Sequence, residues 1–403
     1  MATNIPVKTL LGYLPDELIE RLSIEHSVDK QVKKLNGKIV FKLLLYGVLS
    51  SSQLSLNVLI CLFDKIGFRS LIGVSKDFNT KRNSLADRLI SLNSDFLKSL
   101  FEESVKIFAK HLPARQINGY SIHMFDSTFV ACSAKLLNFG MQMGRKSKDE
   151  THRYNHLKFT VGFNGSIPEK VKFYDQATDA ADDVPLKEVI LEMAFSSKDV
   201  AVFDRGLKSR ETFEEFTQIG DAQRLFVSRI NPTKGFKVIK NNEISQNKTE
   251  SLTILSDQIV KLYHKGRLTK TLFRLVIAQK NDESQEPIFF VSNILDDLTA
   301  IEITDIYRLR WEIERFFRFI KQNLNFSHLI SRDYNAIKTM VYVMLIAAMF
   351  IALYAKLNNR NGFKINKLKF LYELEAELIK ELIILCKGDS NLLNQFFDTG
   401  FGQ

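Results

Sequence analysis

Four residues with charged or phenolic side chains recur at helical spacing in the last quarter of the chain. Tyr307, Arg310, Glu314 and Lys321 lie in a segment without Pro or Gly, where apolar residues recur every three or four positions, as in an amphipathic helix. At about 100° per residue, the four side chains fall within a stripe roughly 60° wide. The predicted helix therefore presents one carboxylate in a row of cationic and phenolic donors, beside an apolar face.

Each of these residues also has a purely structural interpretation. Arg310 and Glu314, at positions i and i+4, could form a surface ion pair worth a few tenths of a kcal/mol. Tyr307 could be an aromatic residue at the edge of the core, and Lys321 could extend its stem along an apolar surface. The choice between these alternatives depends on what other parts of the chain bring to the same place.

Two aspartates stand where strands are predicted. Asp126 interrupts an apolar run rich in β-branched and aromatic residues, which predicts two tightly joined strands or one long buried strand. Asp204 follows a short buried strand at 200–203, and a helix is expected to begin near Lys208. Carboxylates that bind ligands occupy such strand ends in α/β sheets. Asp126 could instead be a turn residue, and Asp204 a helix cap.

The spacing of the four helical residues, Y-x2-R-x3-E-x6-K, resembles the signature of the transposases of bacterial insertion sequences, specifically the insertion sequence four family. In that family the glutamate is the third member of an Asp–Asp–Glu metal site. The local patterns M-F-D-S-T at Asp126 and D-R-G at Asp204 match the surroundings of the family's two aspartates. The resemblance implies that Asp126, Asp204 and Glu314 are the catalytic residues and the metal ligands.

The chemistry that such a site performs follows from its ligands. Mg²⁺ prefers oxygen ligands and keeps several waters that substrate phosphates can displace, and Mn²⁺ could substitute for it. With two metal ions bound, one activates water or a 3′-hydroxyl and the other stabilises the departing oxygen. The resemblance thus implies a transposase that binds the ends of an insertion sequence and catalyses metal-dependent strand cleavage and strand transfer. Tyr307, Arg310 and Lys321 would hold DNA phosphates.

The resemblance also implies the partners: double-stranded DNA, as terminal inverted repeats and as target, and a second copy of the chain in a homodimer on paired ends. Some relatives stack a tryptophan on a flipped base during hairpin formation. The one tryptophan here is Trp311, so Phe236 or Tyr263 would have to replace it if a hairpin forms. Two alternative functions stay open: a catalytically silent, transposase-derived DNA-binding protein, and a Mg²⁺-dependent nuclease without strand transfer.

The predicted fold class is α/β, with a ribonuclease-H-like catalytic core in which helices flank a mixed sheet. Residues 1–115 carry helical periodicity, and their resemblance to the helical N-terminal region of the same transposases implies that they bind the DNA ends. Residues 116–230 would form the first part of the core and residues 231–300 a β-rich insertion. Residues 301–403 would complete the core with the signature helix and an α-rich C-terminus. Composition alone supports only a small antiparallel module at 231–300.

Two basic residues in the N-terminal part are candidate DNA contacts. Lys81 and Arg82 lie in the first turn of a predicted helix that Asn79 or Thr80 could cap. A helix N-terminus with such side chains suits contacts with phosphates and base edges. A solvated helix face explains the same residues equally well.

Four further polar residues admit two interpretations each. His156 and Lys158 share one face of an alternating segment, as exposed strand residues or as DNA contacts beside the metal site. Asp182 or Asp183 precedes a helical pattern, and a helix cap is the favoured interpretation. The segment between residues 144 and 156 is polar and basic, which predicts a loop.

Charge and composition indicate where the protein works. The formal net charge of +10 favours a polyanionic partner, nucleic acid before membrane. Residues 340–355 carry no formal charge, but this run is shorter than the roughly 20 residues that span a bilayer, which predicts a helix buried against the sheet. The cysteines Cys61, Cys132 and Cys386 lack metal-ligand spacing and suit a reducing compartment. We expect a bacterial cytoplasmic protein, associated with the nucleoid through DNA and not with a membrane.

Overall fold

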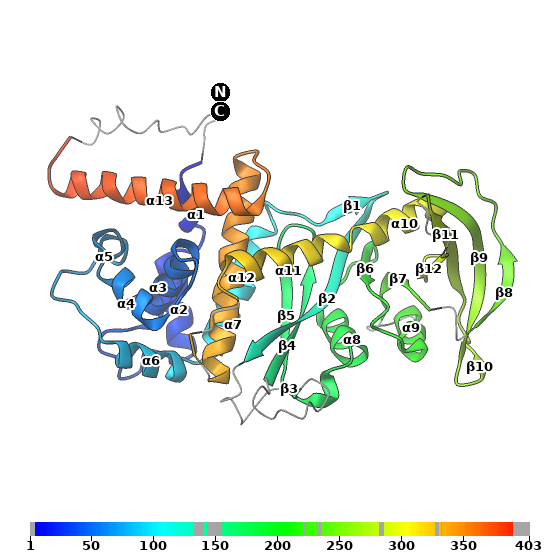
Figure 1. Ribbon diagram of the computed structural model, residues 1–403, viewed down its shortest axis with the longest axis horizontal. Helices are drawn as coiled ribbons and strands as arrows, with labels where there is room; N and C mark the ends of the chain where they lie inside the picture. Colours follow the sequence, from blue (N-terminus) through cyan, green and yellow to red (C-terminus); the bar gives the residue numbers. More distant parts are fainter. Residues whose placement is uncertain are drawn as a thin grey trace.

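The computed structural model describes residues 5–132, 141–142, 155–218, 220, 223–231, 235–281, 286–326, 330–331 and 333–389. Nearly all of the loop predicted between residues 144 and 156 lies outside these residues. Helices from the two ends of the chain gather on one side of the molecule, and a large sheet fills the other side (Figure 1).

The N-terminal part is helical in every regular element before residue 115. The helices are α1 Val7–Leu11, α2 Asp16–Glu25, α3 Gly37–Ser50, α4 Leu56–Phe63, α5 Ile66–Ile72, α6 Arg82–Ser91 and α7 Ser94–Phe108. Asn36 and Ser55 accept hydrogen bonds from the first turns of α3 and α4, as helix caps do. The cap predicted for α6 is wrong, because Lys81 occupies that position and makes no capping bond with its side chain.

The sheet has twelve strands and mixed pairing. Its strands are β1 Arg115–Ile117, β2 Tyr120–Cys132, β3 Met141–Gln142, β4 Asn155–Phe163, β5 Pro168–Tyr174, β6 Asp199–Phe203, β7 Leu225–Arg229, β8 Phe236–Asn241, β9 Leu252–His264, β10 Arg267–Leu268, β11 Phe273–Lys280 and β12 Ile288–Ser292. Among the described strands, β6 pairs in parallel with β2 and with β7, and the other pairs are antiparallel. The residues around Asp126 form one long strand, β2.

The β-rich segment predicted at 231–300 is continuous with the rest of the sheet. Its strands β8 to β12 pair antiparallel with one another, and β12 then pairs with β7. Figure 1 shows this part curving away at the far end of the molecule from the N-terminal helices. The antiparallel strands thus extend the central sheet at its edge, although composition alone indicated only a small antiparallel module.

Helices cover both faces of the central strands. The helices α8 Asp183–Glu192 and α9 Arg210–Thr217 follow a short 3₁₀ turn at Ala177–Asp179. They pack with Phe125 and Phe203 in one apolar cluster. The opposite face of the sheet carries Met124 and Phe159, which belong to a larger cluster shared with Phe316 of the signature segment. A mixed sheet between helical layers, as expected for an α/β protein, is therefore present.

The signature segment forms two helices, although one continuous helix is predicted. α10 spans Ala300–Arg308 and α11 spans Trp311–Asn323. At the junction the N–H groups of Arg310 and Glu312 donate to the carbonyls of Tyr307 and Leu309, three residues back, which is the tighter 3₁₀ pattern. Leu309 and Arg310, the two residues between the helices, keep helical dihedral angles. The side chains on either side of the junction therefore stay on one side of the segment.

Two long helices complete the described chain. α12 spans Tyr334–Leu357 and α13 spans Phe363–Leu385. Of the helices in the described residues, α12 alone is long and apolar enough to cross a membrane, and 94% of its most apolar window is buried inside the protein. The prediction that residues 340–355 form a buried helix is confirmed. Its place differs from the prediction, because α12 packs chiefly against the helices α7, α3 and α13 and makes a smaller contact with the sheet at β5.

Candidate active site

The parallel pairing of β2 with β6 brings two of the predicted site residues together. Phe125 lies opposite Phe203 in the last pair of the ladder, so the next residue on each strand, Asp126 and Asp204, lies one step beyond it. Neighbouring strands are about 4.8 Å apart. Because Phe125 and Phe203 point into the cluster under α8 and α9, alternation turns the following side chain of β2 to the other face. That face is the one packed against α11.

Asp126 lacks enough positive charge around it to stay ionised easily. Burial raises the pKa of Asp126 to about 7, and repulsion from Asp204 and Asp182 adds to the increase. The N–H of Ser127, which donates to Asp126 Oδ1 at 2.8 Å, and the charge of Arg310 oppose this effect. A cation placed beside Asp126 would favour the ionised form of this carboxyl group and lower its pKa.

Arg310 links Asp126 to the third predicted carboxylate. Arg310 Nη2 lies 2.6 Å from Glu314 Oε1, and Nη1 of the same guanidinium lies 4.0 Å from Asp126 Oδ2. Only 11% of the Arg310 side chain is exposed, so this is more than the surface ion pair that the i,i+4 spacing alone would indicate. In the part of the chain that the structure describes, no three Asp, Glu, His or Cys side chains stand close enough to share one metal ion.

The other two members of the signature stripe lie along the same line. The Tyr307 ring lies 5.6 Å from the Arg310 guanidinium, and burial raises the pKa of Tyr307 against the opposing charges of Arg310 and Arg229. Burial lowers the pKa of Lys321, and the negative charge of Asp126 partly offsets that decrease. Lys321 is thus within electrostatic reach of Asp126.

Arg229 is a member of this group that the sequence did not indicate. It ends β7, and its guanidinium lies 5.9 Å from the centre of the Tyr307 ring. The one signal in the sequence was a cation near the end of the strand-like run RLFVSRI, residues 224–230. That signal is weak, because exposed cations commonly end strands.

A fourth carboxylate, Asp182, also faces the predicted site. Asp204 Oδ1 accepts a hydrogen bond from the N–H of Gly206 at 2.7 Å. A Cβ added at Gly206 would lie 2.7 Å from that same oxygen and 2.6 Å from Asp182 Oδ2. The two carboxylates therefore converge on Gly206, where only a residue without a side chain leaves them room.

The helix cap predicted at Asp182 or Asp183 is wrong in its chemistry. Asp182 occupies the N-cap position of α8, but its side chain makes no capping bond. It pairs with Lys158 instead, at 2.7 Å between Nζ and Oδ1. Asp183 accepts from the N–H groups of Lys208 and Ser209, at 2.5 and 2.8 Å, and so ties the start of α8 to the segment before α9.

Lys158 is buried, so both interpretations of it, exposed strand residue and DNA contact, are wrong. Its side chain has no exposed surface, and Nζ donates to the carbonyls of Asp179, Ala180 and Ala181 at 3.0 Å each. These three bonds and the pair with Asp182 satisfy the ammonium fully. Lys158 therefore holds the 179–182 segment in the position that turns Asp182 toward Asp204.

Lys81 and Arg82 are not part of this group. Both are exposed at the start of α6, and α6 lies among the N-terminal helices, on the other side of α12 from β2 and β6 (Figure 1). The helix α6, with Lys81 and Arg82 at its start, therefore lies in a different part of the molecule from β2 and β6 (Figure 1).

The donor set suits a hard divalent cation. Asp126, Asp204, Asp182 and Glu314 offer only carboxylate oxygens, the ligands that Mg²⁺ prefers. The Arg310 guanidinium lies between Asp126 and Glu314 and offsets part of their negative charge. Asp126 lies within β2, which continues to Cys132, and not at a strand end as predicted. The fold and the site together define a mixed α/β protein with carboxylates where the parallel pairing of β2 and β6 ends.

Comparison with known proteins places the chain in a family. The family model described as "Transposase DDE domain" matches residues 117–350, which is more than half of the chain. The chain therefore belongs to the DDE-domain transposases, and the predicted relationship to transposases of insertion sequences is confirmed.

Named relatives agree with this assignment. A Synechocystis protein, named as a transposase for insertion sequence element IS4SA, is 24% identical over 339 residues, 82% of this chain and 86% of that protein. A Sinorhizobium fredii protein, named transposase y4zB, is 27% identical over 41% of this chain and 45% of its own length. This chain thus spans less than half of the second relative. A Geobacillus stearothermophilus protein, named as a transposase for IS5377, is 23% identical over 62% of this chain and 61% of that protein.

One solved structure is similar over most of the chain. The cryo-EM structure of the piggyBac transposase synaptic complex with hairpin DNA covers 95% of this chain and 83% of its own, at 11% identity and a TM-score of 0.48.

Proposed function

We propose that this protein is a DNA transposase that binds the ends of an insertion sequence and catalyses metal-dependent strand cleavage and strand transfer. The observation that carries the proposal is the β2–β6 register, which sets Asp126 beside Asp204 while Arg310 joins Asp126 to Glu314. The core is proposed to be ribonuclease-H-like, with 231–300 as its β-rich insertion and 1–115 as the end-binding region.

Asp126, Asp204 and Glu314 are the proposed metal ligands and catalytic residues. Bound Mg²⁺, or Mn²⁺ in its place, would supply an activated oxygen nucleophile and stabilise the leaving oxygen at phosphorus, in a two-metal arrangement. The chain's own contribution is to hold these carboxylates on two strands and a helix whose positions are fixed by packing. Without cations, a pocket lined by acceptor-only groups would repel a phosphodiester.

The cations along the signature segment are proposed to position the DNA backbone. Arg310 pairs with Glu314, and Lys321 is within electrostatic reach of Asp126. The guanidinium groups of Arg229 and Arg310 lie 5.9 and 5.6 Å from the centre of the Tyr307 ring. Arginine binds a phosphate through a planar fork, whereas lysine acts as a point charge. Lys81 and Arg82 are proposed to contact the element ends separately. The active form is proposed to be a homodimer on paired DNA ends.

The test incubates purified protein with labelled DNA carrying the borders of its own element, a target plasmid and Mg²⁺. Wild type is expected to cut the labelled strand and join it to the plasmid, and Asp126→Asn is expected to bind the DNA without cutting it. Binding without cleavage by wild type would favour a silent DNA-binding protein. Cleavage without a joined product would favour a nuclease.

A further inference from the structure

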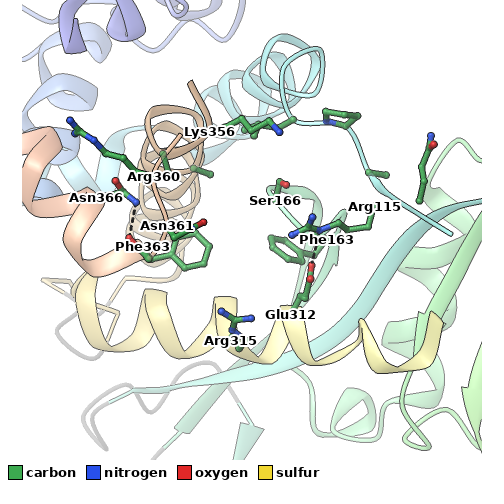
Figure 2. Close-up of a pocket in the computed structure, with 18 residues that line it drawn as sticks. Arg115, Phe163, Ser166, Glu312, Arg315, Lys356, Arg360, Asn361, Phe363 and Asn366 are labelled. Carbon is green, nitrogen blue, oxygen red and sulfur yellow. Dashed lines mark hydrogen bonds and ion pairs between the residues drawn. The ribbon is translucent and has the colours of Figure 1, made fainter. Parts of the chain in front are cut away.

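A large cavity lies on the side of α11 that carries Glu312 and Arg315, away from Glu314. It has a volume of about 750 Å³ and is lined by the segment after α7, the β4–β5 turn, α11, the end of α12 and the start of α13. Figure 2 shows Glu312 and Arg315 pointing into it from α11, with Arg115 and Ser166 on one side and Lys356 and Arg360 on the other. We call this cavity the basic cleft.

The basic cleft carries a surplus of positive charge. Four cationic side chains line it, Arg115, Arg315, Lys356 and Arg360, against one carboxylate, Glu312. Arg315 and Lys356 are exposed and form no ion pair with any described residue. An open cavity with this charge balance raises the local concentration of anions.

The two other cations are held in place by the protein. Arg115 Nε lies 3.5 Å from Glu312 Oε2, and both side chains pack on Gly165. A Cβ at that glycine would lie 2.6 Å from Arg115 and 2.8 Å from Glu312, and its φ of +92° also favours glycine. Arg360 is fixed by Tyr354 and by Glu373, the latter at 3.3 Å.

The basic cleft and the acidic residues cannot serve the same phosphate. Glu312 and Glu314 are two positions apart on α11, which turns their side chains about 200° from each other. The body of a helix, about 10 Å across with its side chains, therefore separates the two sites.

We infer that the basic cleft binds the phosphodiester backbone of a DNA segment other than the strand being cut. The cations do not converge on one point, as they would around a single phosphate, but lie around the opening on separate elements (Figure 2). A duplex strand offers one phosphate per about 3.4 Å of its axis, so several cations can each meet a different phosphate. The inference rests on the proposed DNA partner but not on cleavage.

The test measures DNA binding in a background that cannot cut, Glu314→Gln. A fluorescein-labelled duplex of arbitrary sequence is titrated at several salt concentrations, with and without Arg315→Ala and Lys356→Ala together. Because each neutralised phosphate contributes about 0.9 to the slope of log K against log salt, the double variant is expected to lower that slope by about 2. The residues are exposed, so the thermal midpoint should stay unchanged.

The matched control replaces Lys98 and Lys106, two exposed lysines of α7 outside the cleft, with alanine. An equal loss of slope in this control, or an unchanged slope in the cleft variant, overturns the inference. The inference is also overturned if excess deoxyadenosine monophosphate abolishes the difference in slope between the parent and the cleft variant, because that result would indicate a mononucleotide site. If the parent does not bind the duplex at all, the proposed function fails with it.

Discussion

Strand β6 has a carboxylate at each end, Asp199 at its start and Asp204 after its last residue, and the charged groups around the two ends differ. At its start, Asp199 lies 3.5 Å from His123 Nε2, and Glu169 lies 2.7 Å from Nδ1 of the same ring. Burial disfavours the charge on Asp199, but His123 and the N–H of Ser196 outweigh it and hold the pKa of Asp199 below its ordinary value. Here the protein supplies its own counter-charge.

At the other end of β6 the balance is reversed. Asp126 and Asp204 have Asp182 as a further neighbour, and the pKa of Asp126 rises to about 7 through burial and repulsion. Arg310, which lies 4.0 Å from Asp126, also pairs with Glu314. The two ends of β6 therefore differ: Asp199 has a buried partner of opposite charge in His123, whereas burial and neighbouring carboxylates raise the pKa of Asp126 beside Asp204. We call the Asp199 end the closed end and the end at Asp126 and Asp204 the open end.

The largest expected effect on cleavage comes from removing the carboxylate of Glu314, which Arg310 links to Asp126 at the open end of β6. Glu314→Gln keeps the shape of α11 but removes one proposed ligand charge, so strand cleavage should fall by more than the roughly 100-fold that loss of a supporting group costs. DNA binding should persist. Initial rates with labelled end DNA and Mg²⁺ provide the measurement.

The matched control is Glu312→Gln, on the opposite side of the same helix. It removes the same charge at nearly the same distance along α11, and because Glu312 lies in the basic cleft and not beside Asp126, cleavage at saturating DNA should stay within a few-fold of wild type. Similar losses in both variants would mean that the charge of α11, and not the position of Glu314, supports the reaction.

The largest expected effect on the free energy of unfolding comes from Lys158, the buried cation that pairs with Asp182. Lys158→Met removes an ammonium that satisfies three carbonyls and Asp182, so the free energy of unfolding should fall by about 3 kcal/mol. Lys170→Met is the control, because Lys170 pairs with Glu192 where both side chains are partly exposed, and its loss should cost less than about 1 kcal/mol. Urea unfolding measures both, and equal losses would contradict the role assigned to Lys158.

The contacts of His123 with Asp199 and Glu169, at the closed end of β6, predict that the free energy of unfolding depends on pH. Burial opposes the charge on His123, but Asp199 and Glu169 outweigh it and raise the pKa of His123 from 6.5 to about 9. Since the folded-state pKa is the higher one, this contribution is fully present below about 6.5 and is lost as the pH rises through about 9. Its full size is about 3 kcal/mol.

His123→Gln isolates that contribution from other groups that titrate at high pH. The difference in unfolding free energy between wild type and the variant, measured by urea unfolding, should be largest near pH 6 and should shrink by pH 10. A difference that does not change with pH would show that the ring is not protonated in the folded protein.

Local patterns in the sequence predicted the elements that carry the acidic residues, but not how distant elements meet. Asp204 could be placed at a strand end because apolar residues precede it and a helical pattern follows. Lys158 could not be placed, because its burial depends on the 179–182 segment folding over β4. The tight turn at Leu309 and Arg310 has no Gly or Pro to mark it, and the basic cleft draws its cations from separate elements.

The smallest expected effect is the response of folding to metal. If the carboxylates at the open end of β6 bind Mg²⁺, the ion at about tenfold its dissociation constant should stabilise the wild-type fold by about 1.4 kcal/mol. Asp126→Asn should reduce that gain, because it removes a proposed ligand, whereas Asp199→Asn at the closed end should keep it. Thermal unfolding with and without Mg²⁺, at constant ionic strength, separates binding from screening. Equal gains in all three proteins would place the cation elsewhere and remove the distinction between the two ends of the strand.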